Sequence, residues 1–329
     1  SGEPQDTHTA VTPDNFDAGG SVSRQFHLNA GSYRTTATIA RTAPVRHLAA
    51  ARNEELADFN VRYRDGRARF EDYARGDPLL DAVIVMHDGR IVAESYRNME
   101  PWQRHYAWSV SKIFAAAAIA ALAHEGRVDA HQPVETYVDE LAETAWAGTR
   151  VRDIADMASG IACLDEDGYQ DKSTCIYRME ETLGITAPTG YDADFIEHLR
   201  GMQRSGEPGV RFEYVSANTN VLMLIVEKVT GLPYATALRE LIWDRIGPEA
   251  DALITISDEG YAYASGGISA RLRDIARFGE LFVSPAAFDV FGEGIVNDMR
   301  ETGVPFGKDL EIELIETFGA DVPIRASWQ

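Results

Sequence analysis

Apolar residues follow two different spacings along this chain. Residues 82–86 and 91–96 are two apolar-rich runs that flank an Asp-Gly pair at 88–89. Such runs around Asp-Gly predict a β-hairpin, because Asp and Gly readily adopt the positive backbone angles of a two-residue turn. Residues 113–123 are rich in alanine and apolar on every side. That pattern predicts a helix that is buried all round.

Helical spacing also dominates the middle of the chain. Residues 151–158 predict a short amphipathic helix, and residues 218–230 predict a second buried helix that ends at Gly231. Residues 272–282 predict an amphipathic helix, with Ser269 as its N-terminal cap. The chain therefore combines these predicted helices with the predicted hairpin.

Two segments lack any clear periodicity. Residues 1–20 are polar and rich in Asp, Thr, Gly and Pro, and we expect them to form an extended arm. Residues 161–192 are also irregular, and a long irregular segment inside a compact domain is often a functional loop. We therefore expect substrate recognition to reside in the second segment.

Composition narrows the functional classes. The chain has 329 residues, 45% of them hydrophobic, which is enough for a sizeable core. Its formal net charge is −21, which argues against a nucleic-acid partner because phosphate contacts require basic patches. We find no apolar run of membrane-spanning length and expect a soluble protein that does not enter a membrane. Its location stays open, with the cytoplasm favoured over the periplasm.

Cys163 and Cys175 are the only cysteines, twelve residues apart in a polar segment. Their spacing, without a nearby pair of histidines, does not suit a zinc site, so no metal is expected. A disulfide and two free thiols both remain open, because the outcome depends on the redox compartment.

Ser109 and Lys112 are the first candidates for chemistry. Residues three apart share one face of a helix, so a serine that begins the buried helix can approach the lysine amine. Burial favours the neutral form of an amine, which can then accept the serine proton and activate a nucleophile. The alternative is an ordinary lysine near a helix start.

Residues 212–220 hold a second polar group at the start of the next buried helix. Tyr214, Ser216 and Asn218 bring a phenol, a hydroxyl and an amide to one turn. By themselves such side chains could be helix caps. Together with Ser109 and Lys112 they match a known pattern.

The chain resembles the serine β-lactamase and penicillin-binding-protein superfamily, in its class C and carboxylesterase branch, and most closely the 6-aminohexanoate-dimer hydrolases. The stretches that carry this resemblance, in family order, are 109–112, 125–129, 214–219, 226–231, 266–269 and 273–277. The resemblance implies an α+β, β-lactamase-like fold, in which an antiparallel sheet is flanked by helices and a mostly helical domain is inserted. It divides the chain into an arm at 1–20, a sheet domain at 21–106 and 253–329, and a helical domain at 107–252.

The resemblance also implies roles for individual residues. Ser109 would be the acylated nucleophile, Lys112 would take its proton, and Tyr214 would protonate the leaving group. Ser216 and Asn218 would complete the polar wall. No cofactor is implied.

Three more residues are implied to contact substrate. Tyr169 would close over the site, and Glu180 stands where these hydrolases have an aspartate that faces the substrate amine. Ser265 would line the same pocket.

The resemblance implies a serine hydrolase that acts on a small amide or ester, such as a 6-aminohexanoate oligomer or a short-chain ester. A β-lactamase or D-Ala-D-Ala peptidase, and a non-catalytic binding protein, are the alternatives. The superfamily's third motif is not identifiable, and its C-terminal strands appear in no stretch before Gln329. We expect either a cleaved or partial polypeptide or a natural truncation, and a second polypeptide or second copy to complete the sheet.

Overall fold

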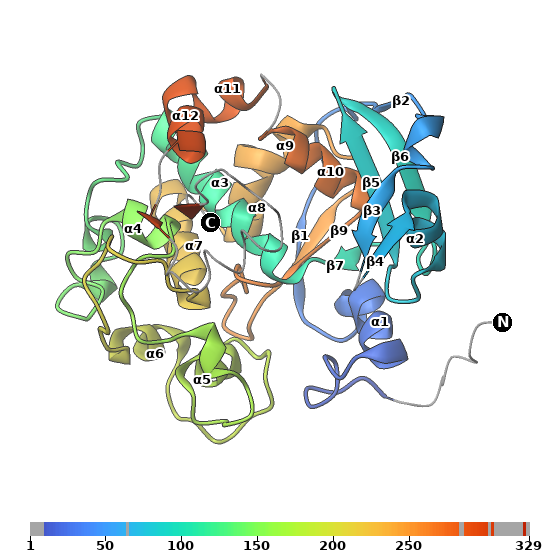
Figure 1. Cartoon of the computed structure of the whole chain (residues 1–329). Coiled ribbons are helices and arrows are strands. Elements are labelled where there is room, and N and C mark those ends of the chain that lie inside the picture. The colour runs from blue at the N-terminus through green and yellow to red at the C-terminus, as the bar shows by residue number, and fades with distance from the viewer. Residues whose placement is uncertain (1–9, 64–65, 283–285, 302–303, 306–324, 327–329) are drawn as a thin grey trace.

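The computed structural model describes residues 10–63, 66–282, 286–301, 304–305 and 325–326. In Figure 1 most helices lie on the left and the long hairpin lies on the right. The helices are α1 (Gly20–Asn29), α2 (Phe70–Gly76), α3 (Ser111–His124), α4 (Val151–Ala155), α5 (Cys175–Thr182), α6 (Phe195–Gly201), α7 (Ser216–Thr230), α8 (Tyr234–Leu238), α9 (Asp244–Ile246), α10 (Leu272–Glu280), α11 (Ala286–Phe291) and α12 (Glu293–Glu301). The strands are β1 (Thr36–Ile39), β2 (Ala49–Ala50), β3 (Asn60–Tyr63), β4 (Gly66–Arg69), β5 (Ala82–His87), β6 (Arg90–Tyr96), β7 (His105–Tyr106), β8 (Ala252–Thr255), β9 (Ile268–Ala270), β10 (Val304–Pro305) and β11 (Arg325–Ala326).

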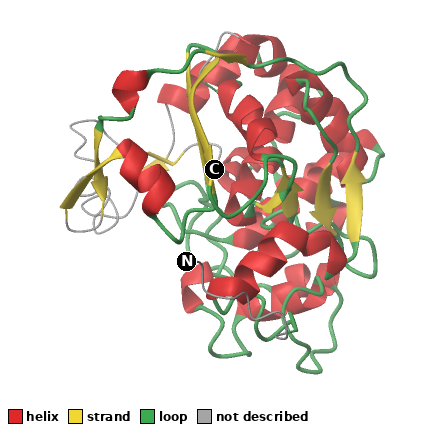
Figure 2. Cartoon of the chain, turned by 90° about the vertical axis from the view of Figure 1, so that its right-hand side faces the viewer, coloured by secondary structure: helices red, strands yellow, loops and turns green. Residues whose placement is uncertain are grey.

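The predicted hairpin is formed by β5 and β6. The turn residues Asp88 and Gly89 have φ values of 48° and 72°, as the Asp-Gly pair predicts. β2 adds to the hairpin in parallel, which gives the order β2-β6-β5. Figure 2 views the molecule from the side of this hairpin and shows helices packed beside the strands.

A second sheet leads directly to the candidate nucleophile. Its strands run in the order β1-β8-β9-β7, and each neighbouring pair is antiparallel. β7 ends at Tyr106, three residues before Ser109. The antiparallel sheets and separate helices confirm the α+β class.

α3 and α7 form the centre of the helical region. The residues of α3 from Phe114 to Leu122 are at most 1% exposed, so the alanine-rich helix is buried as predicted. α7 ends at Thr230 and is capped by Gly231, whose φ of 70° places it in the left-handed region that glycine adopts without strain. The alanines of α3 are small enough for neighbouring helices to pack closely against it.

Two helix predictions need correction. Residues 161–192 are not irregular throughout, because α5 lies within them and begins at a Thr174 cap. Ser269 does not cap α10; it belongs to β9, where it pairs with Leu253 of β8, and Arg271 precedes the helix instead. Pairing within the sheet has overridden the capping preference of serine.

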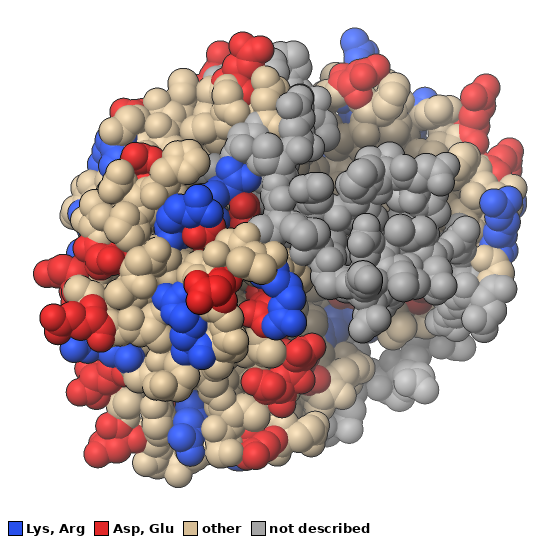
Figure 3. Space-filling view, turned by 60° about the vertical axis from the view of Figure 1, so that its left-hand side comes forward, with Lys and Arg blue, Asp and Glu red and all other residues tan. Residues whose placement is uncertain are grey.

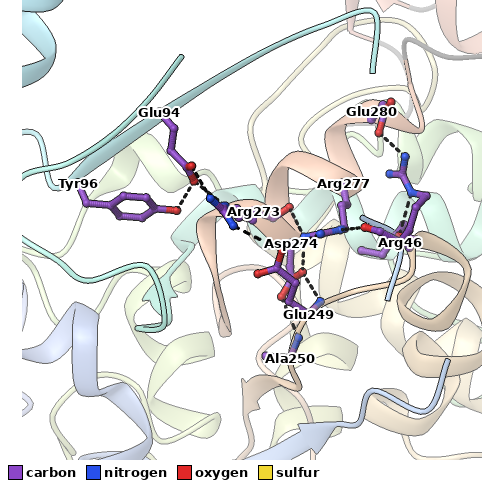
Figure 4. Close-up of polar contacts among 10 residues, drawn as sticks. Arg46, Glu94, Tyr96, Glu249, Ala250, Arg273, Asp274, Arg277 and Glu280 are labelled. Atoms are coloured by element: carbon purple, nitrogen blue, oxygen red, sulfur yellow. Dashed lines mark hydrogen bonds and ion pairs between the residues drawn. The ribbon is translucent and has the colours of Figure 1, made fainter. Parts of the chain in front are cut away.

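Charged side chains of α10 pair within the helix and with a neighbouring strand (Figure 4). Arg277 and Asp274 form an ion pair at 3.1 Å with side chains that are 1% and 0% exposed. Arg273 donates two hydrogen bonds, at 2.6 and 2.7 Å, to Glu94 of β6. These contacts join the hairpin to α10 through bidentate geometry.

α10 in turn packs on the helix that follows the candidate nucleophile. The ring of Phe278 stacks on that of Phe114 in α3, with centroids 3.8 Å apart. The hairpin, α10 and α3 are therefore linked in one chain of contacts.

The surface carries both signs of charge. Figure 3 shows acidic and basic side chains interspersed on the face over the helical region. Within the described residues, no single helix combines the length and apolarity needed to cross a membrane. One pair passes that test only jointly, Ser216–Thr230 with Tyr234–Ile246, and it is bent by 81°.

Candidate active site

Ser109 lies in a short turn rather than in the helix itself. Residues Trp108–Val110 form one 3₁₀ turn, and α3 begins after it at Ser111. The amide of Ala107 donates to the carbonyl of Ile268 at 2.7 Å, which fixes the chain just before this turn. Ser109 is exposed, so a substrate carbonyl can reach its hydroxyl. The expectation that Ser109 begins the helix is therefore wrong, because Ser109 lies in the 3₁₀ turn that precedes α3.

Trp108 has a strained backbone that aromatic packing holds in place. Its φ of 44° is a left-handed conformation that costs a non-glycine residue about 1–3 kcal/mol. Its ring stacks on Phe16 at 5.7 Å and meets the edge of Tyr106 at 4.9 Å. Its Nε1 donates to Nε2 of His27 at 2.9 Å. Burial lowers the pKa of His27 to about 4, so the ring is neutral and can accept this bond.

Lys112 meets Ser109 as the spacing predicts. Its side chain lies in the first turn of α3, is 4% exposed, and brings Nζ to 2.9 Å from Ser109 Oγ. Nζ also donates to the carbonyl oxygen of Ser265 at 2.8 Å. These two contacts aim the amine at the serine hydroxyl.

Tyr214 covers the lysine from the other side. Lys112 Nζ lies 5.0 Å from the centre of the Tyr214 ring, within the range of a cation–π contact. The side chain is 39% exposed, and its hydroxyl makes no hydrogen bond to another described residue. The phenol is therefore available to a bound molecule.

Ser216 and Asp165 form a pair that the sequence analysis did not identify. The amide and the hydroxyl of Ser216 donate to the two oxygens of Asp165 at 2.7 and 2.6 Å. This carboxylate satisfies a free N–H at the start of α7. The Ser216 hydroxyl is already engaged, and no spacing rule marks Asp165 because it belongs to a different segment.

Asn218 and Asn220 lie on different sides of α7. Asn218 is fully buried, its amide nitrogen is 3.5 Å from Met157 Sδ, and its oxygen has no partner among the described residues. Asn220, which the sequence analysis omitted, accepts a bond from the amide of Ser265 at 3.1 Å. Asn220 lies four residues after Ser216, so the two side chains share one helix face, and this spacing could have identified Asn220 from the sequence.

Glu180 is buried beneath two tyrosines. Tyr169 and Tyr263 both donate to its Oε1, at 3.0 and 2.5 Å. Burial raises the pKa of Glu180 to about 7, while the two tyrosine hydrogen bonds act in the opposite direction. The structure thus brings Tyr169 and Glu180 together. Tyr263 was not identified from sequence.

Tyr263 also explains the Gly266-Gly267 pair. A Cβ on Gly266 would lie 2.5 Å from the Tyr263 ring, and one on Gly267 would lie 2.6 Å from the Tyr263 carbonyl oxygen. Only glycine fits this close approach. The tight turn places Ser265 beside Lys112, where the Ser265 hydroxyl is buried and has no partner among the described residues.

Cys163 and Cys175 form a disulfide, one of the two outcomes that the sequence left open. The bridge closes the segment that carries Asp165 and Tyr169 and attaches it to the start of α5. His198 Nε2 lies 3.6 Å from Cys175 Sγ, so three potential metal-ligand atoms gather here. With both sulfurs in the bridge, this group has no thiolate to offer a metal.

Comparisons with known proteins agree with this geometry. The sequence matches the β-lactamase family over residues 77–302. It is 38% identical over 205 residues to a 6-aminohexanoate-dimer hydrolase of Paenarthrobacter ureafaciens, an alignment covering 62% of this chain and 52% of the relative. The chain therefore spans about half the length of this curated relative.

Solved structures show the same fold. A protein of Bacillus anthracis, provisionally named a 6-aminohexanoate-dimer hydrolase, superimposes with a TM-score of 0.77 at 23% identity, covering 97% of this chain and 83% of that one. A provisionally named β-lactamase of Bacteroides dorei gives 0.56 at 19% identity, covering 75% and 72%. The resemblance drawn from the motifs is confirmed, and the chain belongs to the β-lactamase family.

Proposed function

We propose that the chain is a serine hydrolase that cleaves a small amide or ester through an acyl-enzyme on Ser109. The observation that carries this proposal is the 2.9 Å contact between Lys112 Nζ and the exposed Ser109 hydroxyl. A buried amine aimed at an exposed serine is the arrangement that nucleophilic catalysis requires.

In the acylation step, Lys112 accepts the Ser109 proton while Oγ bonds to the substrate carbonyl carbon. The negative charge then moves to the carbonyl oxygen. The Ser109 backbone N–H supplies one donor for that oxygen, and loss of such a donor typically costs about 3–4 kcal/mol. Strain at Trp108 would hold this N–H and Oγ in the orientation that the reaction needs.

Collapse of this intermediate breaks the bond to the leaving group. Tyr214 gives its phenolic proton to the departing amine or alcohol and recovers a proton from Lys112. The phenol suits this role because its hydroxyl has no other partner among the described residues and its ring contacts Lys112. A water molecule then attacks the acyl-enzyme by the same steps in reverse and releases the acid.

The substrate we propose is a 6-aminohexanoate-type amide, with a short-chain ester as the second possibility. Tyr169 and Glu180 would contact it, and Ser216, Asn218 and Ser265 would form the polar surroundings. A substrate ammonium near Glu180 would favour its carboxylate form, which hydrogen bonds from Tyr169 and Tyr263 already assist.

We further propose that an additional strand, from a second polypeptide or a second copy, completes the site. A cavity of about 490 Å³ lies beside the Trp108–Val110 turn, and its lining includes Ala82 of β5 and both residues of β7. β5 and β7 are edge strands of their respective sheets within the described chain. Free strand edges recruit further strands, which here could supply a second oxyanion donor.

Hydrolysis assays with three substrates test the function. We expect turnover of 6-aminohexanoate dimer and of p-nitrophenyl acetate, loss of both in Ser109→Ala, and little turnover of benzylpenicillin. Fast penicillin hydrolysis would favour the β-lactamase alternative. Binding without turnover of any of the three would favour the non-catalytic alternative.

A further inference from the structure

Asp165 holds the short segment 214–216, which carries the Tyr214 phenol. The main-chain N–H of Asp165 donates to the carbonyl oxygen of Tyr214 at 3.1 Å. The two carboxylate oxygens of Asp165 accept the amide and the hydroxyl of Ser216, at 2.7 and 2.6 Å. One residue from a distant segment therefore makes three hydrogen bonds to three consecutive residues, at the point where α7 begins.

The Tyr214 side chain depends on its backbone for its direction. The side chain is exposed, and its hydroxyl has no hydrogen-bond partner among the described residues. Its ring meets Lys112 Nζ at 5.0 Å and the ring of Phe212 at 6.4 Å. Because an exposed ring is not fixed by close packing, the backbone decides which rotamers it can adopt and where the phenol oxygen lies. A shift of segment 214–216 would thus move the phenol relative to Lys112.

Asp165 is itself held in place. It begins the 3₁₀ turn Asp165–Asp167, and its carbonyl oxygen accepts the amide of Gly168 at 3.0 Å. The Gly168 carbonyl oxygen accepts the hydroxyl of Thr174, the residue that caps α5, at 2.9 Å. Ser216 is buried, so its two donors would lose their partner inside the protein if the carboxylate were removed.

We propose that Asp165 is a positioning residue that sets the direction of the Tyr214 phenol and, through it, the protonation of the leaving group. The inference rests on the proposed function and adds a residue to it. Asp165 transfers no proton in this role, because its oxygens only accept hydrogen bonds from the backbone and side chain of Ser216. Its importance should therefore grow with the need of the leaving group for a proton.

Two esters of one acid separate this role from a general effect on folding. p-Nitrophenyl acetate releases an anion that is stable near neutral pH, so its leaving group needs no proton. p-Nitrobenzyl acetate releases an alkoxide that must be protonated as it departs. The quantity measured is the kcat/KM of the p-nitrobenzyl ester divided by that of the p-nitrophenyl ester. This ratio covers the steps up to acylation, so the shared acetyl-enzyme does not affect it.

Three single variants test the proposal. We expect Asp165→Ala to lower the ratio about tenfold, because a small displacement of a proton donor removes much of its effect. Asp165→Asn should keep the ratio, since a carboxamide can accept from the Ser216 amide and donate to the Ser216 hydroxyl oxygen. Asp167→Ala is the matched control and should also keep it. Asp167 is an exposed acid of the same turn, and no hydrogen bond joins its side chain to residues 214–216 in the described part of the chain.

A double variant tests whether the effect passes through Tyr214. Tyr214→Phe should lower the ratio by itself, and adding Asp165→Ala should lower it no further. A further fall in the double variant, or an equal loss on both esters in Asp165→Ala, would overturn the proposal. If Asp165→Ala does not fold, Asp165→Ser takes its place, because its shorter side chain cannot meet both Ser216 donors. A fall of about threefold is then expected, and an unchanged ratio would overturn the proposal.

A measurement without turnover separates this proposal from the proposed function. In protein labelled with 3-fluorotyrosine, the fluorine resonance of Tyr214 is identified by its loss in Tyr214→Phe. We expect this resonance to shift in Asp165→Ala and to stay in place in Asp165→Asn and Asp167→Ala. If wild type cleaves neither ester, the hydrolase function fails, and the resonance still decides whether Asp165 positions the phenol. An unchanged resonance in folded Asp165→Ala protein would overturn the positioning role.

Discussion

Lys112 and Ser265 are joined by a hydrogen bond from Nζ to the main-chain carbonyl oxygen, at 2.8 Å across 153 residues of sequence. Asn220 holds the Ser265 amide at 3.1 Å, so α7 fixes the carbonyl that receives the amine. The direction of the Lys112 amine is therefore set by the 264–267 turn and α7 as well as by α3. This relationship explains why a residue on one helix can serve a serine outside that helix.

Replacing the Lys112 amine should abolish activation of the serine. We expect Lys112→Met to slow acylation about 10³-fold, because no base remains to take the Ser109 proton. The check is the rate of p-nitrophenol release in a stopped-flow assay. Lys228→Met is the control, since Lys228 is a half-exposed residue that pairs with Glu140. Equal acylation rates in Lys112→Met and wild type would contradict the assigned role.

Glu180 should make stability depend on pH. Burial raises its pKa from 4.5 to about 7, so between these values the folded protein keeps a proton that the unfolded chain releases. Ionising Glu180 therefore costs folding free energy as the pH rises through this window, and the full cost is present above it. We expect Glu180→Gln to match wild type near pH 4 and to be up to about 3 kcal/mol more stable than wild type near pH 8. Urea unfolding at both pH values measures the difference. A constant difference would contradict the pKa shift.

Phe16 should stabilise the nucleophile turn. Truncating this 9% exposed ring leaves a cavity against Trp108, so we expect Phe16→Ala to lose about 3 kcal/mol of unfolding free energy. Trp108 would also relax from its left-handed backbone, and acylation should slow. Phe59→Ala is the control, because Phe59 is 60% exposed and its truncation should cost about 0.5 kcal/mol or less. Unchanged acylation in a destabilised Phe16→Ala protein would contradict the expected effect on acylation, even if the expected loss of stability is observed.

The disulfide should position the segment that carries Asp165 and Tyr169. We expect the double variant Cys163→Ser, Cys175→Ser to lose about 3 kcal/mol of stability, as closure of a loop of this length predicts. KM should rise more than kcat falls, because we propose that the closed segment contacts the substrate away from the reacting carbonyl. Thermal unfolding with and without dithiothreitol provides the check. Wild type should respond to the reductant, and the double variant should not.

The buried pair Asp274 and Arg277 should show strong coupling. Arg277→Met alone leaves a buried carboxylate without its cation, and we expect a loss of about 3–5 kcal/mol. Adding Asp274→Asn to that variant should recover part of the loss. Arg75→Met controls for an exposed pair, since Arg75 is 74% exposed beside Glu71 and should cost about 0.5 kcal/mol or less. Additive effects in the double-mutant cycle would contradict coupling.

Local sequence patterns predicted the elements whose structure depends mainly on residues close to them in the sequence. Asp88-Gly89 specifies its turn through backbone angles, Gly231 ends α7 for the same reason, and the alanine run makes α3. The approach of Lys112 to Ser109 also follows from spacing alone. In each case the residues that determine the structure are adjacent or lie one helical turn apart.

The rest of the site depends on distant contacts that no spacing reveals. Asp165 reaches Ser216 across 51 residues, and Tyr263 reaches Glu180 across 83. α5 was missed because its short helix gains support from the disulfide and from tertiary packing rather than from a long periodic pattern. Ser269 joined a sheet because its partner strand is remote in sequence. At Ser269, long-range pairing overrides the local capping preference.

Covalent labelling of Ser109 tests the central claim most directly. Intact-mass spectrometry of the purified protein, before and after treatment with a fluorophosphonate probe, reports both the chain mass and any adduct. The account predicts one adduct, located by peptide mapping at Ser109 and absent from Ser109→Ala and Lys112→Met. No adduct on folded wild-type protein, or an equal adduct on the Ser109→Ala variant, would contradict it.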